Sequence, residues 1–226
     1  MTINCIILAR EKSKRLKNKN LLSFNNKPLI YWTLKNAFKS KIFKKILISS
    51  DWIKLLNYSK SKFTSLIVDK RSKKLSTSTI TSEAVIKYLL RKYKLKDGYT
   101  VLLQPTSPLR KTNYIKKMIK ILKKNNLKTL HSVSTVVNKT LINKDSNIFN
   151  LSKKNSRKNF FLNGSIYIFK NNYFLQKNTI RENPGNYFFN EKEHSLDLDS
   201  VDDLKKFKIK YYYNKNSELI ANSKIK

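Results

Sequence analysis

Short runs of branched aliphatic residues recur along this 226-residue chain, and several are continuously apolar rather than alternating. A strand that is apolar on both sides needs cover on both sides, which is typical of a parallel sheet between layers of helix. We expect strands at Ile3–Ala9, Lys45–Ser49, Ser65–Val68, Thr100–Leu103, Leu130–Val137 and Ser165–Phe169. Helical patterns separate these runs, so the sequence predicts an open, doubly wound α/β sheet that is mostly parallel, with helices on both faces.

The helical patterns have identifiable starting points. Pro28 suits the first position of a helix, and a second helix is expected to begin near Ser82. A third carries apolar residues at helical spacing over 115–122, with lysines on the opposite face. The last is expected to begin at Ser200, whose hydroxyl can cap the helix while the acidic residues at 202–203 favour its N-terminus.

Length and composition indicate one domain, which we expect to span residues 1–213. A polar, poorly periodic stretch indicates a lid or dimerisation excursion within about 138–190, and residues 214–226 read as a polar tail. The single cysteine, Cys5, lies in an apolar run, so no disulfide framework is expected and a reducing cytoplasm is the predicted location. No apolar run approaches the roughly 18 residues of a membrane-spanning helix, so we expect no membrane insertion.

The charge balance is strongly basic, with 49 Lys and Arg against 14 Asp and Glu, a formal net charge of +35. Such a balance points first to a polyanion such as nucleic acid. The basic residues, however, are spread over the whole chain rather than clustered, which is typical of solvated surface. We therefore do not favour nucleic-acid binding as the main function.

Ligands of open α/β sheets bind beyond the carboxyl ends of the strands, so the residues that follow each strand are the first candidates. After the first expected strand, the run "AREKSKRLKNKN" offers Arg10, Ser13, Lys19 and Asn20. Fixed cations, a hydroxyl and backbone amides can hold a triphosphate or pyrophosphate. The stretch contains no glycine and is not a Walker loop, and from charge alone a solvated cationic loop is the competing interpretation.

The fourth expected strand leads into "QPTSPLR", residues 104–110. Its two prolines rigidify the turn. Gln104 offers both a donor and an acceptor to a base or a sugar, and Arg110 is the cation at the far end. An ordinary proline-rich turn is the alternative.

The stretch "SLDLDSVDD" places Asp197 and Asp199 two residues apart in a chain with few acids. In an extended segment these two side chains point to the same side, so they can share one Mg²⁺ with substrate phosphates; a solvated loop is the alternative. The two histidines carry little signal. His131 lies in an expected strand and His194 precedes the acidic pair, so neither nucleophilic catalysis by histidine nor a His-rich zinc site is indicated.

Taken in order over about residues 3–210, these segments resemble the N-acylneuraminate cytidylyltransferase (CMP-sialic acid synthetase) family. "IILAREKSKRLKNKN" is similar to the family's nucleotide loop and "LLQPTSPLR" to a stretch at its sugar site. "NGSIYIF", residues 163–169, resembles its "NGAIYI" strand, and "SLDLDSVDDL" its metal site. Several ordered matches are more specific than any one of them.

The resemblance implies a Rossmann-like nucleotidyltransferase fold with a small dimerisation excursion, a homodimer, and CTP and an acidic sugar as substrates. The substrate-binding residues it implies are Arg10, Ser13, Lys19, Asn20 and Arg71 for CTP, with Gln104, Asn163 and Tyr167 for the sugar side. Asp197 and Asp199 would bind Mg²⁺ and, with Arg10 and Lys19, form the catalytic set; one Asp, acting through water, is the candidate base. The family often has an acid where this chain has Ser78, and Lys139, Arg157 and Lys158 are only candidates for binding the sugar.

The implied reaction moves CMP from CTP to the anomeric hydroxyl of an acidic 2-keto sugar and releases pyrophosphate, for surface glycan synthesis. An N-acylneuraminate or a related nonulosonate is the expected acceptor, with legionaminate, pseudaminate and 3-deoxy-octulosonate as alternatives. A non-catalytic, basic polyanion-binding module on the same scaffold is the second alternative.

Overall fold

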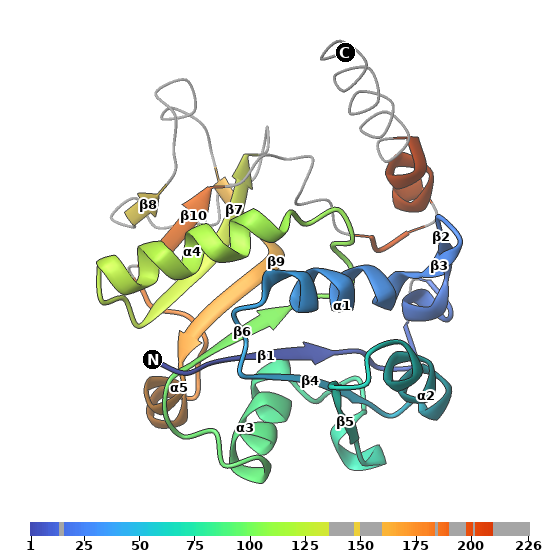
Figure 1. The fold of residues 1–226 in the computed structure, drawn as a ribbon, viewed down its shortest axis with the longest axis horizontal. Helices are drawn as coiled ribbons and strands as arrows, with labels where there is room; N and C mark the ends of the chain where they lie inside the picture. Colours follow the sequence, from blue (N-terminus) through green and yellow to red (C-terminus); the bar gives the residue numbers. More distant parts are fainter. Residues whose placement is uncertain are drawn as a thin grey trace.

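The computed structural model describes residues 1–13, 16–135, 147–149, 160–183, 185–189, 198–200 and 202–209. Within these ranges the chain builds an eight-stranded sheet in the order β5-β4-β1-β6-β9-β7-β10-β8 (Figure 1). The strands are β1 (Ile3–Leu8), β4 (Lys45–Ser50), β5 (Ile67–Lys70), β6 (Tyr99–Leu103), β7 (Thr129–Thr135), β8 (Asn147–Phe149), β9 (Phe160–Lys170) and β10 (Asn186–Phe189). A separate two-stranded sheet joins β2 (Ser23–Phe24) to β3 (Lys27–Pro28).

The large sheet is mostly parallel, as predicted. β1 pairs in parallel with β4 and β6, β4 with β5, and β10 with both β7 and β8. Only β9 runs against its neighbours β6 and β7 among the described strands. The carboxyl ends of β5, β1 and β6 therefore lie along one edge of the sheet, where the loops that follow them can meet.

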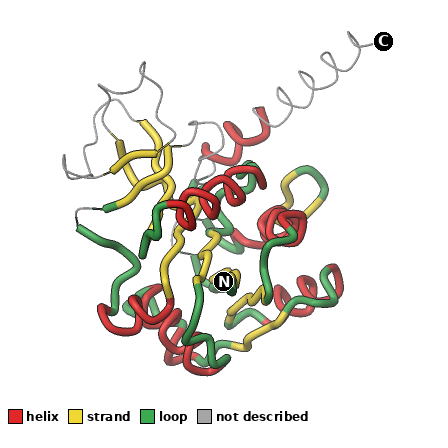
Figure 2. The backbone as a smooth tube through the Cα atoms, turned by 60° about the vertical axis from the view of Figure 1, so that its left-hand side comes forward, coloured by secondary structure: helices red, strands yellow, loops and turns green. Residues whose placement is uncertain are grey.

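Helices cover both faces of this sheet, as Figure 2 shows. They are α1 (Leu29–Ser40), α2 (Ile53–Lys62), α3 (Ser82–Lys92), α4 (Thr112–Lys124) and α5 (Asn171–Lys177). Apolar side chains of α1, α2 and α4 share one core cluster with alternate residues of β1, and those of α3 and α5 share a second cluster with the other face of the sheet. Among the described residues no helix is long and apolar enough to cross a membrane.

Most expected elements lie where the sequence places them, but strands β2, β3, β8 and β10 were not predicted, and there are three further differences. The expected strand Ser65–Val68 is shifted to β5, because Asp69 is buried inside it and accepts hydrogen bonds from the side chains of Ser49 (2.7 Å) and Lys92 (2.6 Å). β9 begins well before the expected Ser165. The short helices α2 and α5 were not predicted, since each buries only two or three side chains on the sheet.

Residues 202–209 form the last helix, and Ser200 caps it as predicted. The backbone N–H of Asp203 donates to Ser200 Oγ (3.1 Å), and the N–H of Ser200 donates back to Asp203 Oδ2 (2.8 Å). Phe207 of this helix is fully buried against Phe24 near the start of the chain, with ring centroids 6.1 Å apart. This packing brings the acidic segment beside the first loop.

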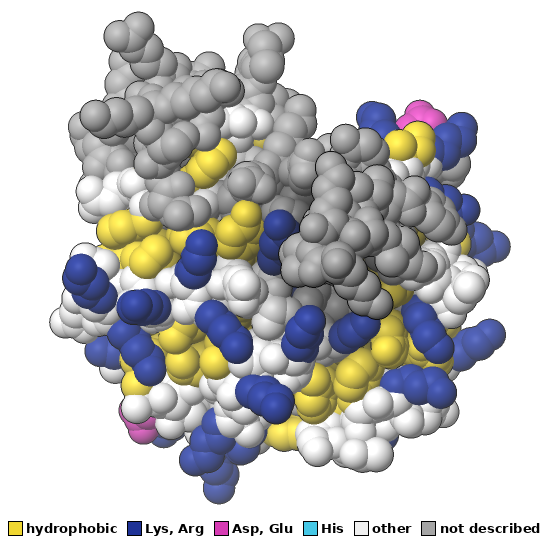
Figure 3. Space-filling view, turned by 45° about the horizontal axis from the view of Figure 1, so that its top comes forward, with side chains coloured by type: hydrophobic (Ala, Val, Ile, Leu, Met, Phe, Trp, Pro, Cys, Tyr) yellow, Lys and Arg dark blue, Asp and Glu magenta, His cyan; other side chains and the backbone are white. Residues whose placement is uncertain are grey.

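Strands β8, β9 and β10 and helix α5 come from the described parts of the stretch predicted as a lid or dimerisation excursion. β9 lies inside the main sheet between β6 and β7, and β10 and β8 extend the sheet beyond β7. The polar tail at 214–226 lies outside the described residues. Over the face seen in Figure 3, Lys and Arg are scattered among apolar and uncharged side chains rather than gathered into one patch.

Candidate active site

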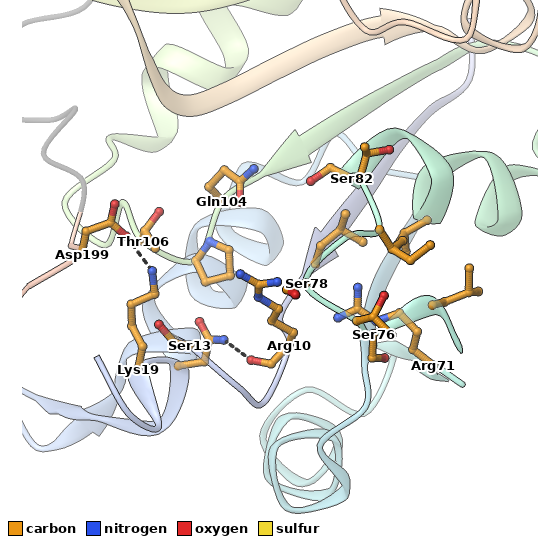
Figure 4. Close-up of a pocket in the computed structure, with 18 residues that line it drawn as sticks. Arg10, Ser13, Lys19, Arg71, Ser76, Ser78, Ser82, Gln104, Thr106 and Asp199 are labelled. Atoms are coloured by element: carbon orange, nitrogen blue, oxygen red, sulfur yellow. Dashed lines mark hydrogen bonds and ion pairs between the residues drawn. The ribbon is translucent and has the colours of Figure 1, made fainter. Parts of the chain in front are cut away.

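A cavity of about 590 Å³ opens at the carboxyl edge of the sheet. Its walls come from the loop after β1, the loop that joins β5 to α3, the start of α3, the loop after β6, and Asp199 near the end of the described chain (Figure 4). Of the predicted site residues, the structure brings seven into these walls: Arg10, Ser13, Lys19, Asn20, Arg71, Gln104 and Asp199.

The loop after β1 is held in shape by its own polar groups and by the next strand. Asn20 is buried, and its side-chain amide donates to the backbone carbonyl of Arg10 (3.1 Å). The backbone N–H of Glu11 donates to Asp51 Oδ1 (2.9 Å) after β4. These contacts leave the Arg10 side chain exposed beside the cavity.

Lys19 and Asp199 form an ion pair across the cavity wall, with Lys19 Nζ 2.8 Å from Asp199 Oδ1. The two residues are 180 positions apart in the chain. Both side chains are largely shielded, with 14% and 24% of their surfaces exposed. The pair therefore places opposite charges next to each other in the cavity wall.

Arg71, the residue after β5, is a buried cation. Its residue is 7% exposed, and among the described residues Nε and Nη2 have no hydrogen-bond partner. The Oδ1 atom of Asp51 lies 3.9 Å from Nη2. Burial lowers the pKa of the Arg71 guanidinium, while Asp51 and Asp69 act in the opposite direction. Two buried donors at a cavity wall are suited to bind an anionic or carbonyl oxygen.

The loop before α3 and the first residue of that helix supply hydroxyl groups that the sequence reasoning did not single out as site residues. Ser76, Thr77 and Thr81 of the loop and Ser82 of the helix line the cavity, as does Ser78. Thr81 also caps α3, since the N–H of Ala84 donates to its Oγ1 (3.2 Å). Ser78, where the family often has an acid, contributes a hydroxyl to the wall. The available signal was the Ser/Thr-rich run itself, between a strand and a helix.

Gln104 is the first residue after β6 and lies at the cavity edge. Its carbonyl accepts a hydrogen bond from Arg110 Nη2 (2.6 Å) and one from the Ser107 N–H (3.4 Å). In the same turn, the carbonyl of Thr106 accepts a hydrogen bond from the N–H of Leu198 (2.8 Å). One turn therefore connects Gln104 to the segment that carries Asp199.

Two predicted substrate contacts, both on β9, do not line the cavity. Asn163 is 3% exposed, and its amide bonds to the hydroxyls of Ser132 and Ser134. Tyr167 is buried in the cluster beneath α3 and α5. Their roles in substrate binding stay predictions. Asp197, His194 and the candidates Lys139, Arg157 and Lys158 lie outside the described residues.

His131 lies in the core on β7, 1% exposed, as the strand pattern suggested. Burial lowers the pKa of this imidazole to about 3, so it is neutral near pH 7. It is far from titrating under ordinary conditions, and the cavity wall does not include it.

The model of a family described as "Cytidylyltransferase" matches residues 4–224. The chain belongs to this cytidylyltransferase family. It is 30% identical over 213 residues to the N-acylneuraminate cytidylyltransferase of Escherichia coli O18:K1:H7 (strain RS218 / NMEC), covering 87% of this chain and 49% of that protein. The chain thus spans about half the length of that relative.

Two further similarities cover nearly full lengths. The pseudaminic acid cytidylyltransferase of Campylobacter jejuni serotype O:23/36 (strain 81-176) is 26% identical over 228 residues, which cover 94% of this chain and 97% of that protein. A solved CMP:2-keto-3-deoxy-manno-octonic acid synthetase complexed with CTP shares the fold, with a TM-score of 0.73 at 13% identity over 95% of this chain and 100% of that one.

The described residues of the cavity include one carboxylate that suits a cation shared with a substrate. Mg²⁺ prefers oxygen ligands and is usually held by one or two carboxylates together with substrate phosphates. Asp199 supplies one such carboxylate at the cavity. No group of three or more metal-binding side chains occurs in the described part of the chain. A single carboxylate in a cavity is the kind of protein ligand that suits Mg²⁺ held together with substrate oxygens.

Proposed function

We propose that the protein transfers CMP from CTP to the anomeric hydroxyl of an acidic 2-keto sugar and releases pyrophosphate. The observation that carries the proposal is the convergence of Lys19, Arg71, Gln104 and Asp199, from four separate segments, on one cavity. Phosphoryl-type transfer needs mainly positioning and charge neutralisation, and this set of groups can supply both.

On the nucleotide side, three cations lie in the cavity wall: Arg10, Lys19 and Arg71. When the anomeric oxygen attacks the α-phosphorus, negative charge grows on the leaving pyrophosphate. Fixed cations aimed at that charge stabilise the transition state without reorganising. The buried donors of Arg71 are suited to nucleotide oxygens, and Ser13 and Asn20 complete this wall.

On the metal side, Asp199 and Asp197 would hold Mg²⁺. When bound, the ion polarises the α-phosphoryl oxygen and lowers the pKa of a bound water or hydroxyl. Lys19 neutralises Asp199 and lies in the same cavity wall, where its charge can also offset that of a substrate phosphate. One of the two carboxylates, acting through water, is the proposed base for the anomeric proton.

On the sugar side, Gln104 presents an amide at the cavity edge, where it can donate to and accept from sugar hydroxyl or acyl groups. We propose an N-acylneuraminate as the acceptor, with pseudaminate next because of the near-full-length Campylobacter relative. Legionaminate and 3-deoxy-octulosonate are the remaining candidates. A homodimer located in the cytoplasm stays part of the proposal.

The test is one assay of CTP-dependent pyrophosphate release, run with Mg²⁺ across a panel of these four acidic sugars. We expect turnover with one sugar well above the others, and loss of that turnover in Asp199→Ala with the fold intact. Near wild-type turnover by Asp199→Ala would contradict the metal assignment. If none of the sugars supports pyrophosphate release and the protein binds polyanions in a salt-sensitive way, the basic binding module is favoured instead.

A further inference from the structure

Arg110 is a buried cation whose guanidinium donates to neutral oxygens on two different strands. The residue is 2% exposed. Nε donates to the carbonyl of Ser165 (3.0 Å) and to its hydroxyl (3.1 Å), both on β9. Nη2 donates to the carbonyl of Gln104 (2.6 Å) at the end of β6. The sequence suggested a cation at the far end of a turn, whereas the structure places the guanidinium beneath that turn.

The Ser165 end of this bridge sits in an irregular part of β9. The pairing of β7 with β9 shifts register between His131 and Val133. On β7 only Ser132 lies between these positions, whereas β9 has residues 163–166 there. Gly164 has a φ of +73°, a conformation that suits glycine, so the strand bulges at this point.

Side chains replace the missing ladder bonds of the bulge. Ser132 Oγ donates to Asn163 Oδ1 (2.6 Å) and accepts from the N–H of Ile166 (2.9 Å). Asn163 Oδ1 also accepts from the N–H of Ser165 (3.0 Å), and its amide nitrogen donates to Ser134 Oγ (2.8 Å). These buried bonds fix where Ser165 presents its two oxygens to Arg110.

The Gln104 end is held from α1 as well. Asn36 Nδ2 donates to the carbonyl of Arg110 (2.8 Å), and Asn36 Oδ1 accepts from Thr112 Oγ1 (2.9 Å). The hydroxyl of Thr33 lies 3.5 Å from the Gln104 carbonyl, to which it donates. The turn is therefore tied to β9 and to α1 on its buried side, and its exposed side faces the cavity.

We propose that Arg110 is a positioning residue for the reaction: it fixes the backbone of Gln104, so that the Gln104 amide meets the acidic sugar in one orientation. Through the two oxygens of Ser165, the "NGS" segment at 163–165 then helps to hold Arg110 in place. A misplacement of about 1 Å in a substrate-orienting group can cost about 100-fold in rate, so a rigid anchor of this kind matters. The inference rests on the proposed function, because it takes Gln104 as a sugar contact.

The geometry calls for arginine in particular. A guanidinium offers donors in a fixed planar fork, which lets one side chain reach Ser165 and Gln104 in different directions. A lysine has one nitrogen on a flexible stem, so Arg110→Lys keeps the charge but cannot reproduce both contacts. Arg110→Met removes the charge as well, and it takes the 2.6 Å donor away from the Gln104 carbonyl and the guanidinium donor away from the Ser165 carbonyl.

The experiment measures sugar and CTP kinetics for wild type, Arg110→Lys, Arg110→Met, Gln104→Ala and the double variant Arg110→Lys/Gln104→Ala. Arg91→Met, an exposed arginine on α3, is the matched control. We expect Arg110→Lys to lower kcat/KM for the sugar at least about tenfold. The dissociation constant for CTP, measured by calorimetry, should change less than about threefold, because Arg110 does not line the cavity.

The double variant separates positioning from general support of the fold. If Arg110 acts through Gln104, adding Arg110→Lys to Gln104→Ala should lower kcat/KM for the sugar by less than about a further twofold. Additive losses, or equal losses for sugar and CTP, would overturn the inference. If Arg110→Met fails to fold, the inference is still tested by Arg110→Lys and by Ser165→Ala, which removes only the hydroxyl acceptor of Arg110 Nε. Failure of the proposed function looks different, because wild type would then turn over none of the sugars.

Discussion

Replacing Arg71 with methionine should leave the folded protein at least as stable and should weaken its binding of CTP. The reason is the state of the guanidinium, which is buried with two donors that lack hydrogen-bond partners within the described chain. Burying a cation costs free energy, and Asp51, 3.9 Å from Nη2, offsets only part of that cost because burial is the largest influence on the pKa of Arg71. Methionine occupies a similar volume with no polar group to desolvate.

The size of the effect follows from the contacts. A hydrogen bond to a charged group contributes about 1.5–3 kcal/mol, which corresponds to about 10- to 150-fold in a dissociation constant. At a CTP concentration about 100 times the wild-type Kd, binding should stabilise the wild-type protein by about 2.7 kcal/mol. If the Kd of Arg71→Met is weaker by about 100-fold, the same CTP concentration should stabilise the variant by only about 0.4 kcal/mol.

The assay is urea unfolding with and without CTP, followed for wild type, Arg71→Met and the exposed control Arg91→Met. We expect the control to match wild type in both conditions. The reasoning is refuted if Arg71→Met loses about 2 kcal/mol or more without ligand and yet keeps the full stabilisation by CTP, since Arg71 would then be a structural residue.

Three further predictions concern separate parts of the molecule. Asp199→Asn should lower pyrophosphate release at least about 100-fold in steady-state assays while CTP binding survives, because Lys19 keeps its charge. Burial lowers the pKa of His131 from its ordinary 6.5 to about 3. Between these two pH values the imidazole is therefore protonated in the unfolded chain but neutral in the folded one. The free energy of unfolding should therefore fall by about 2 kcal/mol from pH 7 to pH 5, a loss absent from His131→Phe in urea titrations at both pH values. Gly98→Ala should cost more than about 2 kcal/mol in the same titrations, because φ is +84° there and an added Cβ would meet the backbone carbonyl of Thr2.

The sequence was informative where parallel strands end. Arg10, Lys19 and Gln104 follow strands whose carboxyl ends share one edge of the sheet, so their convergence follows from the topology. Asp199 joins them because Ser200 caps a helix whose Phe207 packs near the first loop. A capping residue and an apolar face were visible in the sequence.

The remaining parts depend on pairings across strands that no local pattern encodes. The predicted role of Asn163 in substrate binding stays a prediction, but the register shift that places its amide among the serines of β7 could not be foreseen. The sequence placed Arg110 as the cation at the far end of a turn. In the structure its guanidinium donates to Ser165 on β9, and its carbonyl accepts from Asn36 on α1. Asp69 lies inside β5 because Lys92 of α3 reaches it, which shifted the strand boundary.

The most direct test of the central claim is phosphorus NMR of the purified chain incubated with CTP, Mg²⁺ and each acidic sugar in turn. With one of these sugars, the CTP resonances should be replaced by those of a CMP-sugar diester and pyrophosphate in equal amounts. CTP that persists unchanged with every sugar, while the folded protein binds polyanions in a salt-dependent way, would contradict the account.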